Sequence, residues 1–463
     1  MCLEAAPRAD AVRGQGVMRA IALIDGEHYP PVVRFALESL SSEYELVAAV
    51  FIGGTEKVDA AASRDVYGVP VVTGSDRAAA VREAVADFAP EVAVDLSDEP
   101  VVTPADRFEL ASVVLGLGVA YRGADFTFVP PRALETTRTP TLAIIGTGKR
   151  VGKTGISAHI ARYLKASGRD IVVLAMGRGG PAEPELIRGD EVALTTEALL
   201  ALARKGAHAA SDNYEDAVMS RVTTVGCRRC GGGLAGETFF SNVPEGALLA
   251  DSLGKELLVL EGSGAAIPPA HADATLLIVG AGQGVPYVRD YFGPYRLGLA
   301  DAVIVAGAEE PIASAADLAD LVSAIREQRE DVPIVLTTFR PRPIGDVSGR
   351  RVFFATTAPA AVLPLLTAHL ERVFECEVVA ASPHLSDREQ LRADMRAHAG
   401  TYDLLLTELK AAAVDVVAVA GEEAGVPTIL CDNEPVVTDE GDLTGLIDHV
   451  VARAFERHRA RSA

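Results

Sequence analysis

Short apolar runs alternate with amphipathic segments along most of the chain, beginning near residue 19. Between about 19 and 129, apolar runs rich in β-branched residues predict strands, and three intervening segments have helical spacing. The predicted strands are Ala20–Ile24, Glu45–Phe51, Pro70–Val72, Glu91–Leu96 and Val119–Tyr121, and the helices are Pro31–Leu40, Arg77–Phe88 and Thr103–Leu117. This alternation predicts a doubly wound, Rossmann-like α/β domain, although the first turn lacks a glycine fingerprint.

The alternation resumes after a proline-bounded segment at 130–140, where we place a domain boundary. The strands predicted there are Leu142–Ile145, Ile171–Ala175, Leu257–Leu260, Thr275–Val279, Ala302–Val305, Ile334–Thr337, Val352–Phe354, Glu377–Ala380, Leu404–Thr407, Val414–Val419 and Thr428–Cys431. The tail Leu443–Arg461 has the pattern of a basic amphipathic helix that packs on the core or on a second copy. We expect a disordered segment at 1–18, a Rossmann-like domain at 19–135 that binds substrate or acts as a lid, and a catalytic domain at 136–463 with a C-terminal α/β extension.

Composition narrows the class of protein. The chain has 463 residues, 49% of them hydrophobic, and no Trp, so an aliphatic core in two or three domains is expected. Its formal charge of −21 argues against a nucleic-acid partner, which usually meets a basic face. No apolar run reaches the roughly 18 residues that span a bilayer. The first residues lack the apolar middle of a secretory signal, and Met18 could equally be the start, so we expect a cytoplasmic protein.

The segment Thr141–Gly155 predicts a strand, a phosphate-binding loop and the start of a helix. Its glycines let backbone N–H groups point at an anion, and the helix that follows places its N-terminus there. Lys153 can reach the β- and γ-phosphates, and the Thr154 hydroxyl can hold Mg²⁺. The residues assigned to the nucleotide are Gly146, Thr147, Gly148, Arg150, Val151, Gly152, Lys153, Thr154 and Gly155.

Two later segments fit the same phosphate chemistry. Glu261 ends a predicted strand and precedes Gly262-Ser263-Gly264, so its carboxylate is a candidate second group for Mg²⁺. Arg178 follows the strand after the phosphate-loop helix, and its planar fork suits the phosphate being transferred. Further acids in the next polar loop are possible metal carboxylates, namely Glu183, Glu185 and Asp190.

Two glycine-rich loops with basic residues look like anion-binding nests. One contains Arg228 and Arg229, and the other, Gly280–Gly284, leads to Arg289 and Arg296. A further basic turn holds Arg340 and Arg342. Because ATP alone requires fewer cations, this surplus in an acidic protein predicts a small, multiply phosphorylated second substrate.

Two other features of the sequence can be interpreted in more than one way. His28, with Asp25 and Glu27, follows the first predicted strand, where it can bind substrate or merely form a turn before the next helix. Cys227 and Cys230 form a lone CxxC motif among five cysteines. This pair can be reduced thiols that shape a loop, a redox-sensitive pair, or half of a zinc site shared across a dimer.

The run Gly146–Thr154 resembles the phosphate loop of the dethiobiotin synthetase type, written G-T-x-x-x-V-G-K-T, and Glu261–Gly264 resembles that group's E-G-[AS]-G. Arg178 matches the place where its members carry a basic residue. The whole chain, with its extra amino-terminal domain and Cys-Arg-Arg-Cys-Gly-Gly-Gly loop, resembles the cyclic 2,3-diphosphoglycerate synthetase family.

That resemblance implies a P-loop NTPase core with a mostly parallel sheet and a ligase reaction. ATP and 2,3-bisphosphoglycerate would give cyclic 2,3-bisphosphoglycerate, ADP and phosphate, with Mg²⁺ as a cofactor and a homodimer as the assembly. Lys153, Arg178 and the loop amides would stabilise the transferred group, while Lys149 and Arg150 could face the second substrate.

Two alternative functions are also compatible with a P-loop. One is another ATP-dependent ligase or ring-closing synthetase of the dethiobiotin synthetase group, which predicts fewer cationic loops. The other is a regulatory GTPase or metallochaperone, which predicts a guanine-reading NKxD-like motif. The sequence shows none, although Thr407–Lys410 ends a predicted strand where a base could be read.

Overall fold

The computed structural model describes residues 17–53, 64–133, 137–192 and 194–462. The chain forms two compact units, one of Met1–Pro130 with Asp290–Tyr295, the other of Pro131–Arg289 with Arg296–Ala463. Most of the segment expected to be disordered, 1–18, lies outside the described residues. Among those that are described, no helix is long and apolar enough to cross a membrane.

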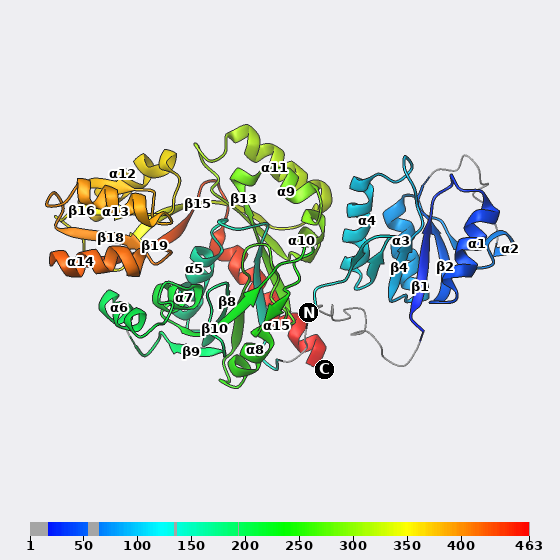
Figure 1. Ribbon diagram of the computed structural model, residues 1–463, viewed down its shortest axis with the longest axis horizontal. Helices are drawn as coiled ribbons and strands as arrows, with labels where there is room; N and C mark the ends of the chain where they lie inside the picture. Colours follow the sequence, from blue (N-terminus) through cyan, green and yellow to red (C-terminus); the bar gives the residue numbers. More distant parts are fainter. Residues whose placement is uncertain (1–16, 54–63, 134–136, 193, 463) are drawn as a thin grey trace, which may run out of the picture. The chain divides into compact units, whose positions relative to one another are not determined.

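The first unit is a six-stranded sheet in the order β3-β2-β1-β4-β5-β6 (Figure 1, blue to cyan). All of its strand pairs are parallel except β5 with β6. The elements are β1 (Arg19–Ile24), α1 (Pro30–Leu40), β2 (Glu45–Phe51), α2 (Arg64–Tyr67), β3 (Val71–Val72), α3 (Arg77–Phe88), β4 (Val92–Asp95), α4 (Pro104–Gly116), β5 (Ala120–Arg122) and β6 (Thr127–Phe128). This strand order confirms the Rossmann-like prediction, with a topological switch between β1 and β4.

The second unit contains one thirteen-stranded sheet, counted over the described residues. Its main path runs β11-β10-β8-β12-β7-β13-β14-β15-β19-β18-β16-β17, and β9 pairs with β10. The strands are β7 (Thr141–Gly146), β8 (Ile171–Gly177), β9 (Glu185–Arg188), β10 (Thr223–Cys230), β11 (Phe240–Ser241), β12 (Leu257–Glu261), β13 (Ala274–Gly280), β14 (Ala302–Ala306), β15 (Ile334–Pro343), β16 (Arg351–Ala355), β17 (Glu377–Ser382), β18 (Leu404–Glu408) and β19 (Thr428–Val437). From β10 to β15 the neighbours are parallel, so their carboxyl ends share one edge.

Helices cover both faces of this sheet. They are α5 (Lys153–Ala166), α6 (Thr196–Arg204), α7 (Asp212–Ser220), α8 (Val243–Asp251), α9 (Pro286–Arg289), α10 (Gly293–Leu299), α11 (Ala315–Gln328), α12 (Leu363–Phe374), α13 (Arg388–Ala397), α14 (Val419–Ala424) and α15 (Leu443–Ser462), with short 3₁₀ or π turns at Ala281–Gln283, Ala360–Val362 and Ala413–Ala418. Residues 142 and 144 of β7 face α5 and α15, whereas 143 and 145 face α8 and α11. Every residue of β7 is therefore buried, as a parallel strand covered on both sides requires.

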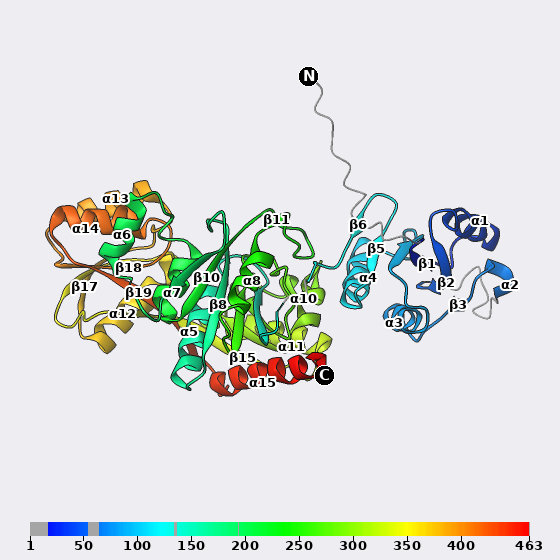
Figure 2. The same ribbon diagram turned by 90° about the horizontal axis from the view of Figure 1, so that it is seen from below.

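The predicted tail helix is present as α15, which runs beneath the sheet in Figure 2. Leu446, Ile447 and Val450 join the core on the α5 side, so this basic helix packs against its own chain.

One prediction of local structure was wrong, and one long strand was missed. Val414–Val419, predicted as a strand, is helical, because Val414, Val416 and Val417 are all buried against α6 and the neighbouring β18. The strand β10 was not predicted, since its second half, Gly-Cys-Arg-Arg-Cys, is polar. Tertiary packing outweighed β-propensity in the first case, and pairing with β8 supplied the missing stabilisation in the second.

Candidate active site

The phosphate loop connects the carboxyl end of β7 to the start of α5. Gly152 caps α5 with φ +86°, a conformation that favours glycine. A Cβ at Gly152 would lie 2.2 Å from the ring of Phe339 on β15, and a Cβ at Gly155 would lie 2.8 Å from the Asn433 carbonyl oxygen on β19. Close neighbours therefore require glycine at both positions, and at Gly152 the backbone angle requires it as well.

Lys153 lies inside this loop rather than on the surface. Its side chain is buried, and its ammonium donates to the Gly148 carbonyl oxygen at 2.8 Å. Burial lowers the pKa of Lys153 to about 8, although the Glu261 carboxylate opposes that shift. The position is the one from which a lysine can reach phosphates bound by the loop amides.

The glycine-rich segment after β13 closes against the phosphate loop. The Thr147 hydroxyl bonds Gln283 Oε1 at 2.5 Å, and the Thr147 N–H donates to the Ile278 carbonyl at 3.0 Å. A Cβ at Gly148 would meet Gln283 Nε2 at 2.5 Å. This segment, predicted as an anion-binding nest, is thus part of the wall of the phosphate loop. Val151 is buried in the core beneath it, and Arg150 is exposed with φ +62°.

Glu261 lies at the carboxyl end of β12, next to the phosphate loop. The carboxylate is buried, and its Oε2 atom has no hydrogen-bond donor among the described residues. Burial and the nearby Asp212 carboxylate raise its pKa, while the adjacent Thr154 hydroxyl opposes the shift. An anionic oxygen without a donor, beside a hydroxyl, fits a hard cation that takes oxygen ligands.

Helix α7 supplies acidic residues that the sequence analysis missed. Its first turns carry Asp212, Glu215 and Asp216, of which Glu215 and Asp216 are buried. Asp216 faces Glu261, and burial together with the Glu261 carboxylate raises the pKa of Asp216. Both carboxylate oxygens of Asp216, like Glu261 Oε2, have no hydrogen-bond partner among the described residues. The Asp-x-x-Glu-Asp spacing after Ser211 was visible in the sequence, but its burial was not.

Three arginines line a pocket of about 480 Å³ at the same edge of the sheet. Its lining residues are Arg178, Gly179, Gly180, Arg228, Arg229, Cys230, Phe240, Ser241 and Asn242, and none of them is acidic. Arg229 donates to the Ser263 carbonyl at 2.8 Å, which ties this pocket to the turn after Glu261. Arg228 donates to the Pro181 carbonyl at 2.6 Å and so holds the Arg178 loop. The structure thus brings together Arg178, Arg228 and Arg229, three of the residues predicted to bind the second substrate.

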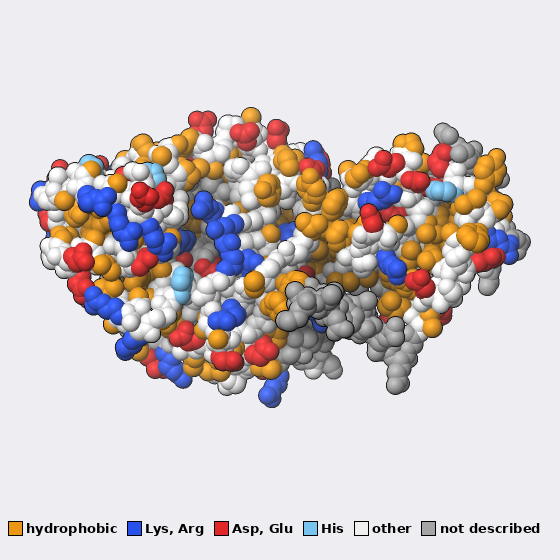
Figure 3. Space-filling model, viewed as in Figure 1, with side chains coloured by type: hydrophobic (Ala, Val, Ile, Leu, Met, Phe, Trp, Pro, Cys, Tyr) orange, Lys and Arg blue, Asp and Glu red, His pale blue; other side chains and the backbone are white. Residues whose placement is uncertain are grey.

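Lys149 extends this cationic surface to the phosphate loop. The neighbouring guanidinium of Arg178 lowers the pKa of Lys149, and burial and Arg150 act in the same direction. Burial, and then Arg178, likewise lower the pKa of Arg229. Cations that disfavour one another's charge are stabilised when a polyanion lies between them. Lys and Arg side chains are gathered over the centre of this unit, near α5, in Figure 3.

Other predicted cations do not reach this pocket. Arg289 forms an exposed ion pair with Glu327 on α11, at 2.5 Å. Arg296 is buried and donates to the carbonyl oxygens of Leu234 and Ala265, at 3.1 and 2.9 Å. Its guanidinium therefore connects the glycine-rich loop that follows Cys230 to the turn after Glu261. The sequence predicted substrate contacts for both residues, but it shows only the charge and not the partner of each side chain.

The remaining basic turn and polar loop also have structural partners. Arg340 pairs with Glu309 at 2.7 Å, and Arg342 pairs with Asp432 at 3.1 Å. Asp190 accepts a hydrogen bond from Thr223, at the amino end of β10, and Glu185 accepts one from Tyr214. Glu183 is exposed. Asp190 thus lies near the amino end of β10, whereas the phosphate loop lies at the carboxyl ends of the strands.

His28 belongs to the first unit, at the carboxyl end of β1. Its Nδ1 atom lies 2.9 Å from Asp25 Oδ1, and Asp25 is buried beside the switch between β1 and β4. Burial opposes ionisation of Asp25, but hydrogen bonds from His28 and from the Asp98 N–H outweigh it and lower its pKa. An ionised, buried Asp25 therefore orients the His28 ring.

The two cysteines of the CxxC motif differ in environment. Cys227 is buried against α8, and burial raises its pKa to about 12, whereas Cys230 is exposed at the arginine pocket. Both are free thiols. Across the residues that the structure describes, no group of three or more His, Cys, Asp or Glu side chains is arranged to hold a metal ion.

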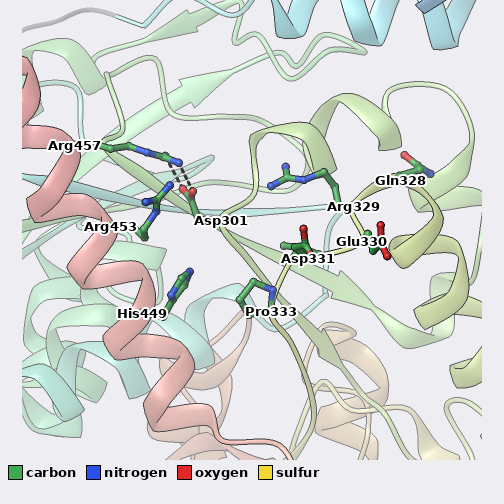
Figure 4. Close-up of a pocket in the computed structure, with 10 residues that line it drawn as sticks. Asp301, Gln328, Arg329, Glu330, Asp331, Pro333, His449, Arg453 and Arg457 are labelled. Carbon is green, nitrogen blue, oxygen red and sulfur yellow. Dashed lines mark hydrogen bonds and ion pairs between the residues drawn. The ribbon is translucent and has the colours of Figure 1, made fainter. Parts of the chain in front are cut away.

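A second pocket, of about 450 Å³, lies at the opposite edge of the sheet (Figure 4). It is lined by Asp301, Gln328, Arg329, Glu330, Asp331, Val332, Pro333, His449, Arg453 and Arg457. Arg457 is paired with Asp301 at 2.5 Å, and Glu330 and Asp331 further offset the charge. Because its cations are balanced by carboxylates, this pocket does not resemble the arginine pocket in chemistry.

A phosphate loop, a buried carboxylate beside its threonine and a neighbouring acid-free arginine pocket are together typical of a P-loop NTPase. Family comparisons give a narrower result. Three models match, described as the N-terminal domain (residues 19–129), the P-loop domain (141–338) and the C-terminal domain (343–434) of cyclic 2,3-diphosphoglycerate synthetase. The chain belongs to the cyclic 2,3-diphosphoglycerate synthetase family.

Individual relatives agree with this family. The cyclic 2,3-diphosphoglycerate synthetase of Rubrobacter xylanophilus is 49% identical over 421 residues, which are 90% of this chain and 94% of that protein. The one from Methanothermus fervidus is 45% identical over 449 residues, 95% of this chain and 98% of its own. Among solved structures, the hydrogenase maturation factor HypB of Archaeoglobus fulgidus is matched over 43% of this chain and 82% of its own, with a TM-score of 0.28 and 13% identity.

Proposed function

We propose that this chain is an ATP-dependent ligase that converts 2,3-bisphosphoglycerate to cyclic 2,3-bisphosphoglycerate, with release of ADP and phosphate. Relatives that carry the name of this activity match nearly the whole chain. The observation that carries the proposal is the acid-free pocket of Arg178, Arg228 and Arg229 beside the phosphate loop. A donor triphosphate and a polyanionic acceptor need such neighbouring sites.

The chemistry proceeds by two substitutions at phosphorus. An oxygen of one substrate phosphate attacks the γ-phosphorus of ATP, and the bond from that phosphorus to the β-phosphate oxygen breaks, releasing ADP. The activated substrate then carries a diphosphate. An oxygen of its other phosphate attacks the carbon-linked phosphorus of this diphosphate, closing the ring and releasing orthophosphate. Because both nucleophiles are already oxyanions, no general base is required.

The protein's contribution is to overcome charge repulsion and to align the reactants. We assign the β- and γ-phosphates of ATP to the loop amides of Gly146–Gly155 and to Lys153. Arg178 and Lys149 stabilise the transferred group from the acceptor side. Arg228 and Arg229 hold the second phosphate of the acceptor. Electrostatic preorganisation of this kind supplies several kcal/mol, of the order of 3 kcal/mol for each aligned donor.

Mg²⁺ is part of this proposal. The Thr154 hydroxyl and the donor-free oxygen of Glu261 would hold it, since both offer the oxygen ligands it prefers. The ion supplies charge neutralisation to the phosphates. Isothermal titration of the protein with MgADP and with ADP in EDTA tests the assignment: Glu261→Gln should remove the difference between them, and an undiminished difference would exclude Glu261.

The proposal also covers the organisation of the chain. We propose a homodimer, a cytoplasmic location suited to an ATP-using protein with free thiols, and a domain boundary near residue 135. The first domain binds substrate or acts as a lid, with His28 as its substrate residue. Light scattering checks the dimer. A change in the His28 ring signals in NMR on addition of 2,3-bisphosphoglycerate would support this role, and unchanged signals would argue against it.

A nucleotide panel tests the function against a GTPase switch. Purified protein is given ATP or GTP with and without 2,3-bisphosphoglycerate, and nucleoside diphosphate release is followed. We expect ADP release that depends on 2,3-bisphosphoglycerate, with one ADP and one phosphate for each substrate consumed. Turnover of GTP alone, unaffected by 2,3-bisphosphoglycerate, would contradict the proposal.

A further inference from the structure

Lys410 approaches the phosphate site from a distant part of the sequence. It follows the buried strand β18, and its ammonium lies 3.1 Å from Glu215 Oε1 on α7. The side chain of Glu215 is only 9% exposed and that of Lys410 is 30% exposed, so the acid is enclosed while the lysine reaches in from a more open position. This ion pair joins the C-terminal α/β extension to the helix that flanks α5 and β8.

Helix α7 carries three acids within five residues, an arrangement that repels itself. Asp212 Oδ2 lies 3.1 Å from the position of a Cβ on Gly177, directly before Arg178. Asp216 faces Glu261. The helix therefore touches both the arginine loop and the proposed metal carboxylate, and its placement needs a countercharge at Glu215.

Lys410 supplies that charge. Burial opposes the charged form of Lys410, but the carboxylates of Glu215 and Glu408 outweigh it and raise its pKa. Burial raises the pKa of Glu215, and Lys410 opposes that shift. The raised pKa of Lys410 favours an ionised Glu215, whereas the raised pKa of Glu215 favours its neutral form. The 3.1 Å contact between the ammonium and Glu215 Oε1 favours the ion pair. In either state the ammonium donates a hydrogen bond to the carboxyl oxygen, so the contact persists.

We propose that Lys410 is a positioning residue for phosphoryl transfer: through Glu215 it holds α7 so that Asp212 supports the Arg178 loop. The inference rests on the function proposed above and extends it to a part of the chain outside the P-loop domain. It also replaces the suggestion that Thr407–Lys410 reads a nucleobase. Lys410 acts through Glu215 and does not contact the reacting phosphates.

The test is a double-mutant cycle with Lys410→Met, Glu215→Leu and the double variant. Each single variant should lower kcat about 10-fold or more, since misplacement of a catalytic loop commonly costs that much. The Kd for ATP should change by less than about 3-fold, because α5 and its loop amides are untouched. The double variant should be no slower than the slower single variant, as expected for residues that act as a unit. Lys410→Arg, which retains the charge, should keep most of the activity.

The matched control is Arg388→Met, which removes an ion pair with Asp415 in the same extension, at 2.8 Å, with both side chains about half exposed. It should leave kcat unchanged. Multiplicative losses in the double variant would show that Lys410 acts on the substrate directly and would overturn the proposal, as would equal losses of kcat and ATP affinity. If Lys410→Met is as active as wild type, only this inference fails; if the wild type forms no cyclic product, the proposed function fails.

Discussion

The ammonium of Lys153 is bonded to the carbonyl oxygen of Gly148, within the same phosphate loop, at 2.8 Å. This contact gives a buried lysine one neutral acceptor, and a bound triphosphate would replace it with charged ones. The pKa of Lys153 is lowered to about 8 because its charge is buried and one neutral acceptor stabilises that charge only weakly.

ATP affinity should fall as the pH rises through about 8. The charged lysine holds the phosphates, and its population in the free protein declines above that pKa, by up to about tenfold for each pH unit. Isothermal titration of ATP from pH 6.5 to 9 measures this dependence. An ATP Kd that is unchanged between pH 7 and 9 would show that Lys153 keeps its proton throughout.

Lys153→Met supplies the control for that titration. The folded-state pKa of Lys153 lies below the ordinary value of 10.5, so the unfolded chain binds more protons between about pH 8 and 10.5. Below about pH 8 the buried lysine is charged in the folded protein, and this charge lowers the free energy of unfolding. The variant should bind ATP weakly at every pH and yet be more stable at pH 7, by about 1–3 kcal/mol. Thermal unfolding checks the sign, and a lower Tm than wild type would refute it.

Arg229→Ala should weaken the acceptor substrate selectively. It removes one guanidinium from the acid-free pocket and the 2.8 Å bond to Ser263. We expect the KM for 2,3-bisphosphoglycerate to rise about 10- to 100-fold, as for the loss of a charged hydrogen bond, while the KM for ATP changes little. Arg289→Ala, which breaks only an exposed pair with Glu327, is the control and should leave both constants unchanged. A raised KM for 2,3-bisphosphoglycerate in Arg289→Ala, with an unchanged KM in Arg229→Ala, would instead indicate that Arg289 binds the substrate.

Asp273 should contribute stability that is lost in acid. Burial opposes its ionisation, but hydrogen bonds from His271 and Thr141 and the charge of Arg461 outweigh this and lower its pKa to about 2. A folded-state pKa below the ordinary 3.8 gives stability that is complete above about pH 4 and disappears as the pH falls towards 2. Asp273→Asn should lower stability at pH 7 by about 2 kcal/mol and have less effect at pH 3.

Thermal unfolding at the two pH values measures this difference. Asp170→Asn, at a carboxylate that is 62% exposed and paired with Lys255, should change little at either pH. Equal destabilisation by Asp273→Asn at both values would mean that its charge does not matter.

The sequence was sufficient for features carried by consecutive residues. The phosphate loop, the acid that ends β12 and the strands buried on both faces were all predicted, because their patterns are local. The partners of individual side chains could not be predicted, because they are distant in the sequence. Arg296 donates to two carbonyl oxygens, and Lys410 pairs with Glu215. The acids of α7 were missed for the same reason, since only the tertiary structure shows that this short helix is buried.

Phosphorus NMR of the protein with MgATP and 2,3-bisphosphoglycerate tests the central claim most directly. The account predicts that the two phosphomonoester signals of the substrate are replaced by a pair of coupled phosphoanhydride signals, together with ADP and orthophosphate in equal amounts. Hydrolysis of ATP to ADP and phosphate with the substrate signals unchanged would contradict it.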